Sequence, residues 1–434
     1  MDKIDWAKEH VLFVANEIPE DADTLDAVKL RSKVEPWLTA LFQSEHLTLL
    51  TGAGISYAIH DMATGKKSVG MNSQKFKVFA DDIEKQAKKS AICAGRGTSN
   101  IEDQVRVANE IACGIRHLNP KCFAEGTPTA KDLESDINCV LDDFIKGVLL
   151  TEKNVLESKN ASVAIEYLMS FLVSFASRSA TRERLNIFTT NYDRFVEFAS
   201  DIAGIRLLDR FAGTLSPLFR SSRLEVDMHY NPPGIRGEPR YLEGVVHISK
   251  LHGSLDWVYH NGYVRRIALP FGSESIDPYL PKENEEECCP VMIYPNAAKD
   301  RETAEYPYVD LFRDFAAGVC RPNSTLVVYG YSFGDEHINR VIKDMLSIPS
   351  THLVIIAYND DGKRVSTFAS KVRTAQLTVL MGSHFGDLKT LVDNYLPKPA
   401  IDKASIRMAD LLKARSVKPN GSGDEGKKGE GEKV

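Results

Sequence analysis

The sequence predicts an α/β protein with a Rossmann-like, doubly wound, mostly parallel sheet and a large helical insertion. Short apolar segments rich in β-branched residues recur along the chain, at residues 46–50, 185–190, 244–248, 326–329 and 353–357. Helical patterns separate these segments, an alternation that is typical of parallel sheets covered by helices on both faces. Residues 72–180 are rich in Ala, Lys, Glu, Leu and Asp with almost no strand signal, which predicts the helical insertion.

The first 45 residues place apolar side chains at helical spacing. Trp6 to Ala15 and Val34 to Phe42 follow this pattern, which predicts two amphipathic helices. We therefore expect residues 1–45 to form a segment of N-terminal helices that leads into the core. The strand at 46–50 comes next and stops at a glycine loop, which marks the first β-α turn.

Three further segments complete the predicted organisation. Within the insertion, residues 95–100 interrupt the helical pattern, and Ser99 or Asn100 is suited to cap the next helix. Residues 203–243 and 256–308 are dense in Pro, Gly, Arg and Tyr, and predict elaborated loops or a small β-rich subdomain. We expect a catalytic domain over residues 46–400, then a C-terminal helix and a disordered tail over 401–434.

Charge and composition narrow the class of protein. The chain has 434 residues, a net charge of -6 and a pI of about 6.0, which argues against direct binding of nucleic acid or acidic lipid. It shows neither an apolar run of about 18 to 20 residues nor the pattern of a signal peptide, so we expect a cytoplasmic protein. Its seven cysteines form no C-x-x-C pair, and we expect no disulfide framework and no metal.

A glycine loop follows the first predicted strand. In Gly52-Ala53-Gly54-Ile55-Ser56 the small residues would let backbone N–H groups approach a pyrophosphate at a helix N-terminus. The third glycine of the dehydrogenase fingerprint would fall at Tyr57, and a P-loop would need Ser or Thr at Lys67. A purely structural β-α turn is the alternative interpretation of this loop.

Polar segments follow three later strands. Thr190-Asn191-Tyr192-Asp193 and Leu251-His252-Gly253 each stand at the carboxyl end of a predicted strand, where open α/β sheets bind ligands. Asn191 or Asp193 could instead cap the next helix, and a single histidine in such a place is more often structural. The third segment, Gly330-Tyr331-Ser332-Phe333, precedes Asp335, for which we predict an N-cap role, and His337, for which we predict a structural role.

Taken in order, these four segments resemble the NAD-binding core of sirtuins. They are most similar to the sirtuin-like NAD hydrolases of bacterial anti-phage defence, of the kind paired with a HerA-type ATPase. The resemblance implies that Asn191 and His252 are catalytic, with His252 acting on the ribose hydroxyls as acid and base. It implies that the diphosphate and ribose of NAD contact Gly52, Ala53, Gly54 and Ser56. The nicotinamide side would contact Asn191 and Asp193, and the adenosine half would contact Gly330 and Ser332.

The resemblance implies an NAD glycohydrolase that releases nicotinamide and ADP-ribose and depletes NAD. An asparagine amide can fix a water or a ribose hydroxyl, and a histidine can accept a proton near neutral pH, as cleavage through an oxocarbenium-like state requires. Sirtuin deacylases carry two C-x-x-C pairs that this chain lacks. A deacylase, an ADP-ribosyltransferase and a non-catalytic NAD or ADP-ribose sensor remain alternatives, as does cyclisation in place of hydrolysis.

The resemblance also implies partners. We expect NAD as substrate, assembly into a homo-oligomer, and a HerA-type ATPase or another sensor protein. The helical insertion and the N-terminal helices are the surfaces expected to mediate assembly, because apolar stripes on helices can be shared between chains. The alternative is that those stripes only complete the core.

Overall fold

The computed structural model describes residues 4–68, 73–93, 99–118, 127–178, 182–222, 227–230, 240–242, 244–281, 289–292 and 306–398. The chain divides into two compact units, Met1–Pro397 and Lys398–Val434. The predicted C-terminal helix and tail over 401–434 lie outside the described residues.

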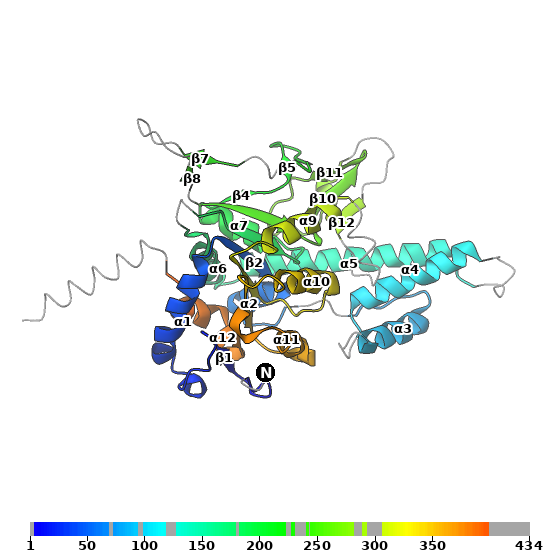
Figure 1. Cartoon of the computed structure of the whole chain (residues 1–434). Coiled ribbons are helices and arrows are strands. Elements are labelled where there is room, and N and C mark those ends of the chain that lie inside the picture. The colour runs from blue at the N-terminus through cyan, green and yellow to red at the C-terminus, as the bar shows by residue number, and fades with distance from the viewer. Residues whose placement is uncertain are drawn as a thin grey trace, which may run out of the picture. The chain divides into compact units, whose positions relative to one another are not determined.

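The main sheet has eight strands in the order β1-β15-β14-β13-β2-β3-β9-β4. All neighbouring strands pair in parallel except β1, which is antiparallel to β15. From β2 and β13 at the centre, the chain adds β3 and then β9 on one side and β14 and then β15 on the other, with β4 and β1 at the two edges, so the predicted doubly wound α/β fold is confirmed (Figure 1). The strands are β1 (Val11–Phe13), β2 (His46–Thr51), β3 (Asn186–Thr189), β4 (Arg206–Leu208), β9 (Val245–Lys250), β13 (Ser324–Tyr329), β14 (His352–Ala357) and β15 (Leu377–Met381).

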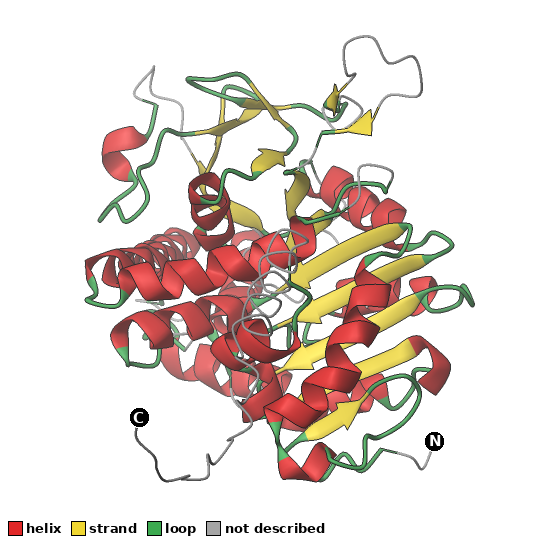
Figure 2. Ribbon diagram, turned by 90° about the vertical axis from the view of Figure 1, so that its left-hand side faces the viewer, coloured by secondary structure: helices red, strands yellow, loops and turns green. Residues whose placement is uncertain are grey.

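Helices cover both faces of this sheet (Figure 2). One face packs against α1 (Ala27–Phe42), α2 (Ala53–Thr64), α6 (Ala161–Ala176) and α7 (Phe195–Ile202), and the other against α9 (Tyr308–Val319), α10 (Glu336–Met345) and α11 (Arg364–Ala369). Leu49 belongs to the first apolar core and Leu50 to the second, since successive side chains of a strand point to opposite faces. Burial on both faces explains the continuous apolar runs by which these strands were predicted.

The N-terminal segment differs from its prediction. Residues Val11–Phe13 form β1 at the edge of the main sheet, where a helix was predicted, whereas the second predicted helix is present as α1. Phe13 pairs with Val379 and Leu12 with Leu380, so the strand is specified by residues far away in the sequence. A three-residue strand carries too few positions to show a period of two, and the apolar spacing around it matched a helix by coincidence.

The described part of the insertion is helical, as predicted. It contains α3 (Ala80–Cys93), α4 (Ile101–His117) and α5 (Ala130–Glu157), followed by α6. Asn100 is the N-cap of α4 and forms a capping box with Asp103, which confirms one of the two predicted caps. Figure 1 shows α4 lying beside the outer part of the long helix α5, and α3 lying beside α4. These three helices form a third apolar core together with residues of the strand β10.

The two Pro- and Gly-rich regions are β-rich in their described parts. A second sheet has the order β12-β10-β11-β6-β5, and β7 pairs with β8. These strands are β5 (Phe211–Ala212), β6 (Leu218–Phe219), β7 (His229–Tyr230), β8 (Arg240–Tyr241), β10 (Gly253–His260), β11 (Tyr263–Arg266) and β12 (Cys289–Met292). Among the helices that the structure describes, none has the length and apolar character needed to cross a membrane.

Candidate functional site

The glycine loop follows β2, and the three polar segments follow β3, β9 and β13. The carboxyl ends of these four strands lie on one edge of the sheet. Chain order reverses between β2 and β13, and ligands of open α/β sheets bind at such a switch point. The loops after these two strands touch through their backbones, because the N–H of Gly54 donates to the carbonyl of Gly330 over 2.9 Å. A Cβ on Gly54 would lie 2.5 Å from the Cα of Gly330, so this contact requires glycine.

The helix α2 begins at this contact. Its N-cap is Gly52, which provides no side-chain capping bond, so only backbone stands between the first turn and an approaching group. The positive end of the helix dipole favours an anion at this position. Ala53, at the start of α2, is half-buried, and Ser56, three residues later, is buried.

Asn191, Ser56 and Asp193 form one hydrogen-bonded chain. Asn191 is buried, and its Nδ2 donates to the carbonyl of Gly52 over 3.1 Å and to Oγ of Ser56 over 2.8 Å. Ser56 Oγ in turn donates to Oδ2 of Asp193 over 2.6 Å. The carbonyl of Gly52 can only accept, which fixes the amide orientation and directs Oδ1 of Asn191 away from these partners.

Two cationic side chains hold the loop after β3 in place. Nζ of Lys250 donates to the carbonyl of Asp193 and to Oε1 of Glu197, the latter over 2.9 Å. Arg194 forms a buried ion pair with Glu152 of α5, with Nη2 at 2.6 Å from Oε2, and its backbone N–H also donates to Glu152. Burial raises the pKa of Glu152, and the charge of Arg194 opposes that shift. The helical insertion is thereby joined to the loop that carries Asn191.

His252 follows β9 and is buried. Its Nε2 lies 4.0 Å from Oδ2 of Asp335, and its ring centroid lies 6.3 Å from that of Tyr192 and 5.8 Å from that of His337. The carbonyl of Tyr192 accepts a hydrogen bond from the N–H of Leu255, so the loops after β3 and β9 lie against each other. Gly253, at the turn from β9 into β10, has a φ of 87°. Glycine adopts such a positive φ without steric cost.

Two residues near His252 are ones for which the sequence predicts an N-cap role and a structural role. Asp335 occupies the N-cap position of α10 as predicted, but its side chain makes no capping hydrogen bond and faces His252 instead. His337 was predicted to be structural, and the structure places its ring beside that of His252. Both follow the end of β13 within eight residues, a spacing that could have assigned them to the same sheet edge.

The structure brings some of the predicted site residues into contact with one another and leaves others further away. Gly52, Gly54, Ser56, Asn191, Asp193 and Gly330 are joined by the contacts given above. His252 is linked to them through Tyr192. Ser332 is exposed, and its Oγ and the guanidinium of Arg364 both lie near Gly334.

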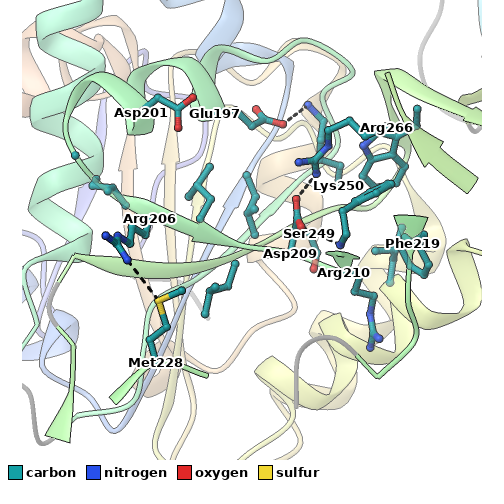
Figure 3. Close-up of a pocket in the computed structure, with 18 residues that line it drawn as sticks. Glu197, Asp201, Arg206, Asp209, Arg210, Phe219, Met228, Ser249, Lys250 and Arg266 are labelled. Atoms are coloured by element: carbon teal, nitrogen blue, oxygen red, sulfur yellow. Dashed lines mark hydrogen bonds and ion pairs between the residues drawn. The ribbon is translucent and has the colours of Figure 1, made fainter. Parts of the chain in front are cut away.

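A cavity of about 600 Å³ lies beside the carboxyl half of β9 and along β4. Figure 3 shows Lys250 facing Glu197, and Arg266 facing Asp209, in its wall. Phe211 and Trp257 supply aromatic surface, with ring centroids 4.9 Å apart. The sequence did not predict this cavity, because its lining residues come from separate strands and helices. Lys250, the last residue of β9, lines this cavity and also donates to the loop that carries Asn191.

Residues 185–378 match the family model of the SIR2-like domain. This stretch is therefore similar to SIR2-like domains, and it contains the loops after β3, β9 and β13, while the loop after β2 precedes it. Among curated proteins, none matches the chain.

Solved structures of sirtuins also match. A Sir2 homologue in complex with ADP-ribose is 14% identical, with a TM-score of 0.36 over 89% of this chain and 99% of that chain. Sir2 bound to an acetylated peptide is 13% identical, with a TM-score of 0.37 over 86% and 98%. A structure concerning sirtuin substrate affinity is 12% identical, with a TM-score of 0.39 over 83% and 97%.

Proposed function

We propose that this chain is an NAD glycohydrolase, which uses water to hydrolyse NAD to nicotinamide and ADP-ribose with release of a proton. The observation that carries the proposal is the buried hydrogen-bonded chain of Asn191, Ser56 and Asp193 beside the N-terminus of α2. The match of residues 185–378 to the SIR2-like domain supports the coarser statement that the chain uses NAD. The proposed catalytic domain spans residues 46–400.

In the proposed mechanism the first turn of α2 receives the diphosphate. The loop glycines Gly52 and Gly54 allow this turn to pack against the backbone of Gly330, and the helix dipole attracts the charge of the diphosphate. Gly330 supports the loop from the far side through its backbone contact, and Ser332 lies further out, on the side proposed for the adenosine half. Ala53 completes the small-residue turn.

The proposed chemical step takes place at the ribose carbon that bears nicotinamide. As that bond breaks, its electron pair neutralises the pyridinium ring and the ribose gains oxocarbenium character. The carboxylate of Asp193 stabilises the developing positive charge, and Oδ1 of Asn191 positions the attacking water. His252 accepts the proton when the new carbon–oxygen bond forms.

We also propose a biological setting from the resemblance of the four segments. NAD depletion would serve anti-phage defence in the bacterial cytoplasm, with the chain assembled as a homo-oligomer. A HerA-type ATPase, or another sensor protein, would supply the recognition of infection. The absence of C-x-x-C pairs from the sequence favours NAD hydrolysis over protein deacylation.

The test is incubation of the purified chain with NAD, with and without its partner, and quantification of nicotinamide and ADP-ribose by chromatography. Asn191→Ala and His252→Ala should each abolish turnover. His117→Ala and Asn359→Ala, which change exposed residues of the same types, should retain it. NAD binding without turnover under every condition would contradict the hydrolase and indicate a sensor.

A further inference from the structure

Three possible metal ligands converge beside the candidate site. His252, Asp335 and His337 each offer one ligand atom, and these atoms lie within 4.8 Å of one another. Nε2 of His252 lies 4.0 Å from Oδ2 of Asp335. The mechanism proposed above uses only His252, so it leaves the presence of the other two residues unexplained.

The elements around this cluster hold its side chains in place. His252 is fixed at the end of β9, while Asp335 and His337 lie at the start of α10 and are partly accessible. Phe312 of α9 packs edge-on against the ring of His337, with centroids 4.7 Å apart and an interplanar angle of 71°. Asp335 stands at the N-cap position of α10 without a capping hydrogen bond from its side chain, and its Oδ2 lies 4.0 Å from Nε2 of His252.

We propose that His252, Asp335 and His337 bind one Zn²⁺, and that the bound ion blocks NAD cleavage; the second half rests on the function proposed above. Two imidazoles and one carboxylate form a known type of three-residue zinc site, which leaves a fourth position for water. Ligand distances of about 2.0–2.2 Å place tetrahedral ligand atoms about 3.4 Å apart. The ligand atoms, now within 4.8 Å of one another, reach this geometry if the partly accessible side chains of Asp335 and His337 turn inward.

The same chemistry explains why zinc would inhibit. A histidine nitrogen that coordinates a metal has no free electron pair, so His252 could not accept the proton that the attacking water releases. Mg²⁺ prefers oxygen ligands and keeps several waters, so it should not bind this nitrogen-rich set. The sequence-based expectation of no metal considered cysteine ligands only, and the three residues here come from two distant segments, the end of β9 and the start of α10.

Zinc binding is measured first, without reference to NAD. The full chain, stripped by a chelator, should bind one Zn²⁺ in calorimetry, and His337→Gln and Asp335→Asn should each weaken binding at least tenfold. His117→Gln and the exposed Asp344→Asn, on the same helix α10, are the matched controls and should bind like the unchanged chain. Co²⁺ in place of Zn²⁺ should show no thiolate absorption, which distinguishes this site from one built on cysteines. Unchanged affinity in both site variants, or thiolate absorption, would overturn the site.

The inhibitory role has its own readout. Zn²⁺ at saturation should lower NAD cleavage at least tenfold, a chelator should restore it, and His337→Gln should remain active at the same zinc concentration. Full activity of the zinc-loaded chain would overturn inhibition and leave the site established. If the metal-free chain binds zinc but never cleaves NAD, the proposed function fails while the zinc site stands.

Discussion

At the scale of single residues, Ser56 determines whether Asn191 and Asp193 act together. Its hydroxyl accepts from Asn191 and donates to Asp193, so Ser56→Ala removes both bonds and leaves the amide and the carboxylate without their shared partner. Losing a hydrogen bond to a charged group costs about 1.5–3 kcal/mol, which corresponds to roughly a 10- to 100-fold loss of NAD cleavage. Steady-state kinetics measure this, with the exposed Ser32→Ala as control. Wild-type kcat in Ser56→Ala would show that the bonded chain does not position the site.

Gly54 matters because it has no side chain, which allows the backbone of Gly330 to approach closely. In Gly54→Ala the new Cβ would lie 2.5 Å from backbone of Gly330, which has to move, and we expect a loss of about 1–3 kcal/mol in the free energy of unfolding. Gly147→Ala is the matched control, because a Cβ there meets nothing within 4 Å and α5 should gain about 0.5–1 kcal/mol. Urea unfolding of both variants measures the difference, and equal stabilities would contradict the close approach.

At the scale of elements, the ion pair of Glu152 and Arg194 joins α5 to the loop after β3. Arg194 also donates to the carbonyls of Leu269 and Pro270, so one guanidinium connects three segments. Glu152→Gln leaves a buried arginine without its counter-charge, which typically costs about 3–5 kcal/mol. Chemical denaturation measures this loss, and Glu157→Gln, an exposed change on the same helix, should alter stability by less than about 0.5 kcal/mol. A similar small loss in both variants would show that the ion pair does not fix the loop.

The contact of α1 with β14 and β15 should depend on pH. Nε2 of His352 lies 2.8 Å from Oγ1 of Thr378, to which Nε1 of Trp37 donates over 2.9 Å, so the Thr378 hydroxyl donates to a neutral imidazole. Burial lowers the pKa of His352 to about 4. The unfolded chain takes up this proton near pH 6.5 and the folded chain does not, so stability falls as the pH drops from 6.5 toward 4, by roughly 3 kcal/mol in all.

His352→Gln tests this dependence, because its amide oxygen can still accept from Thr378 but does not titrate. Urea unfolding at pH 7.5 and pH 5 should show a drop in stability that is smaller in the variant by roughly 2 kcal/mol. Identical drops in the two proteins would assign the acid sensitivity to other groups.

The elements also show how far the sequence alone could reach. Apolar runs predicted β2, β3, β9, β13 and β14, because a strand buried on both faces does not alternate between apolar and polar side chains. The same reasoning did not identify β1, whose pairing with β15 is non-local. At the site, motif order brought Asn191 and His252 to one sheet edge, but the capping preference of aspartate concealed the orientation of Asp335.

At the scale of the whole first unit, β1 connects the two cores that lie on opposite faces of the main sheet. Leu12 belongs to the core that includes α1 and α2, and Phe13 to the core that includes α9 and α10. The strand also covers the edge of β15, a run of apolar and β-branched residues. A short edge strand thus protects hydrogen-bonding groups that would otherwise pair with another chain.

Deleting residues 1–14 should therefore do more than remove three strand residues. Both cores lose buried side chains, for which large-to-small changes typically cost about 2–5 kcal/mol each, and the exposed edge of β15 becomes a template for intermolecular pairing. We expect a lower Tm together with concentration-dependent light scattering, whereas deletion of residues 1–3 alone should change neither. A lower Tm without scattering would mean that β15 is protected by something other than β1, and an unchanged Tm would mean that the two cores are stable without the strand that joins them.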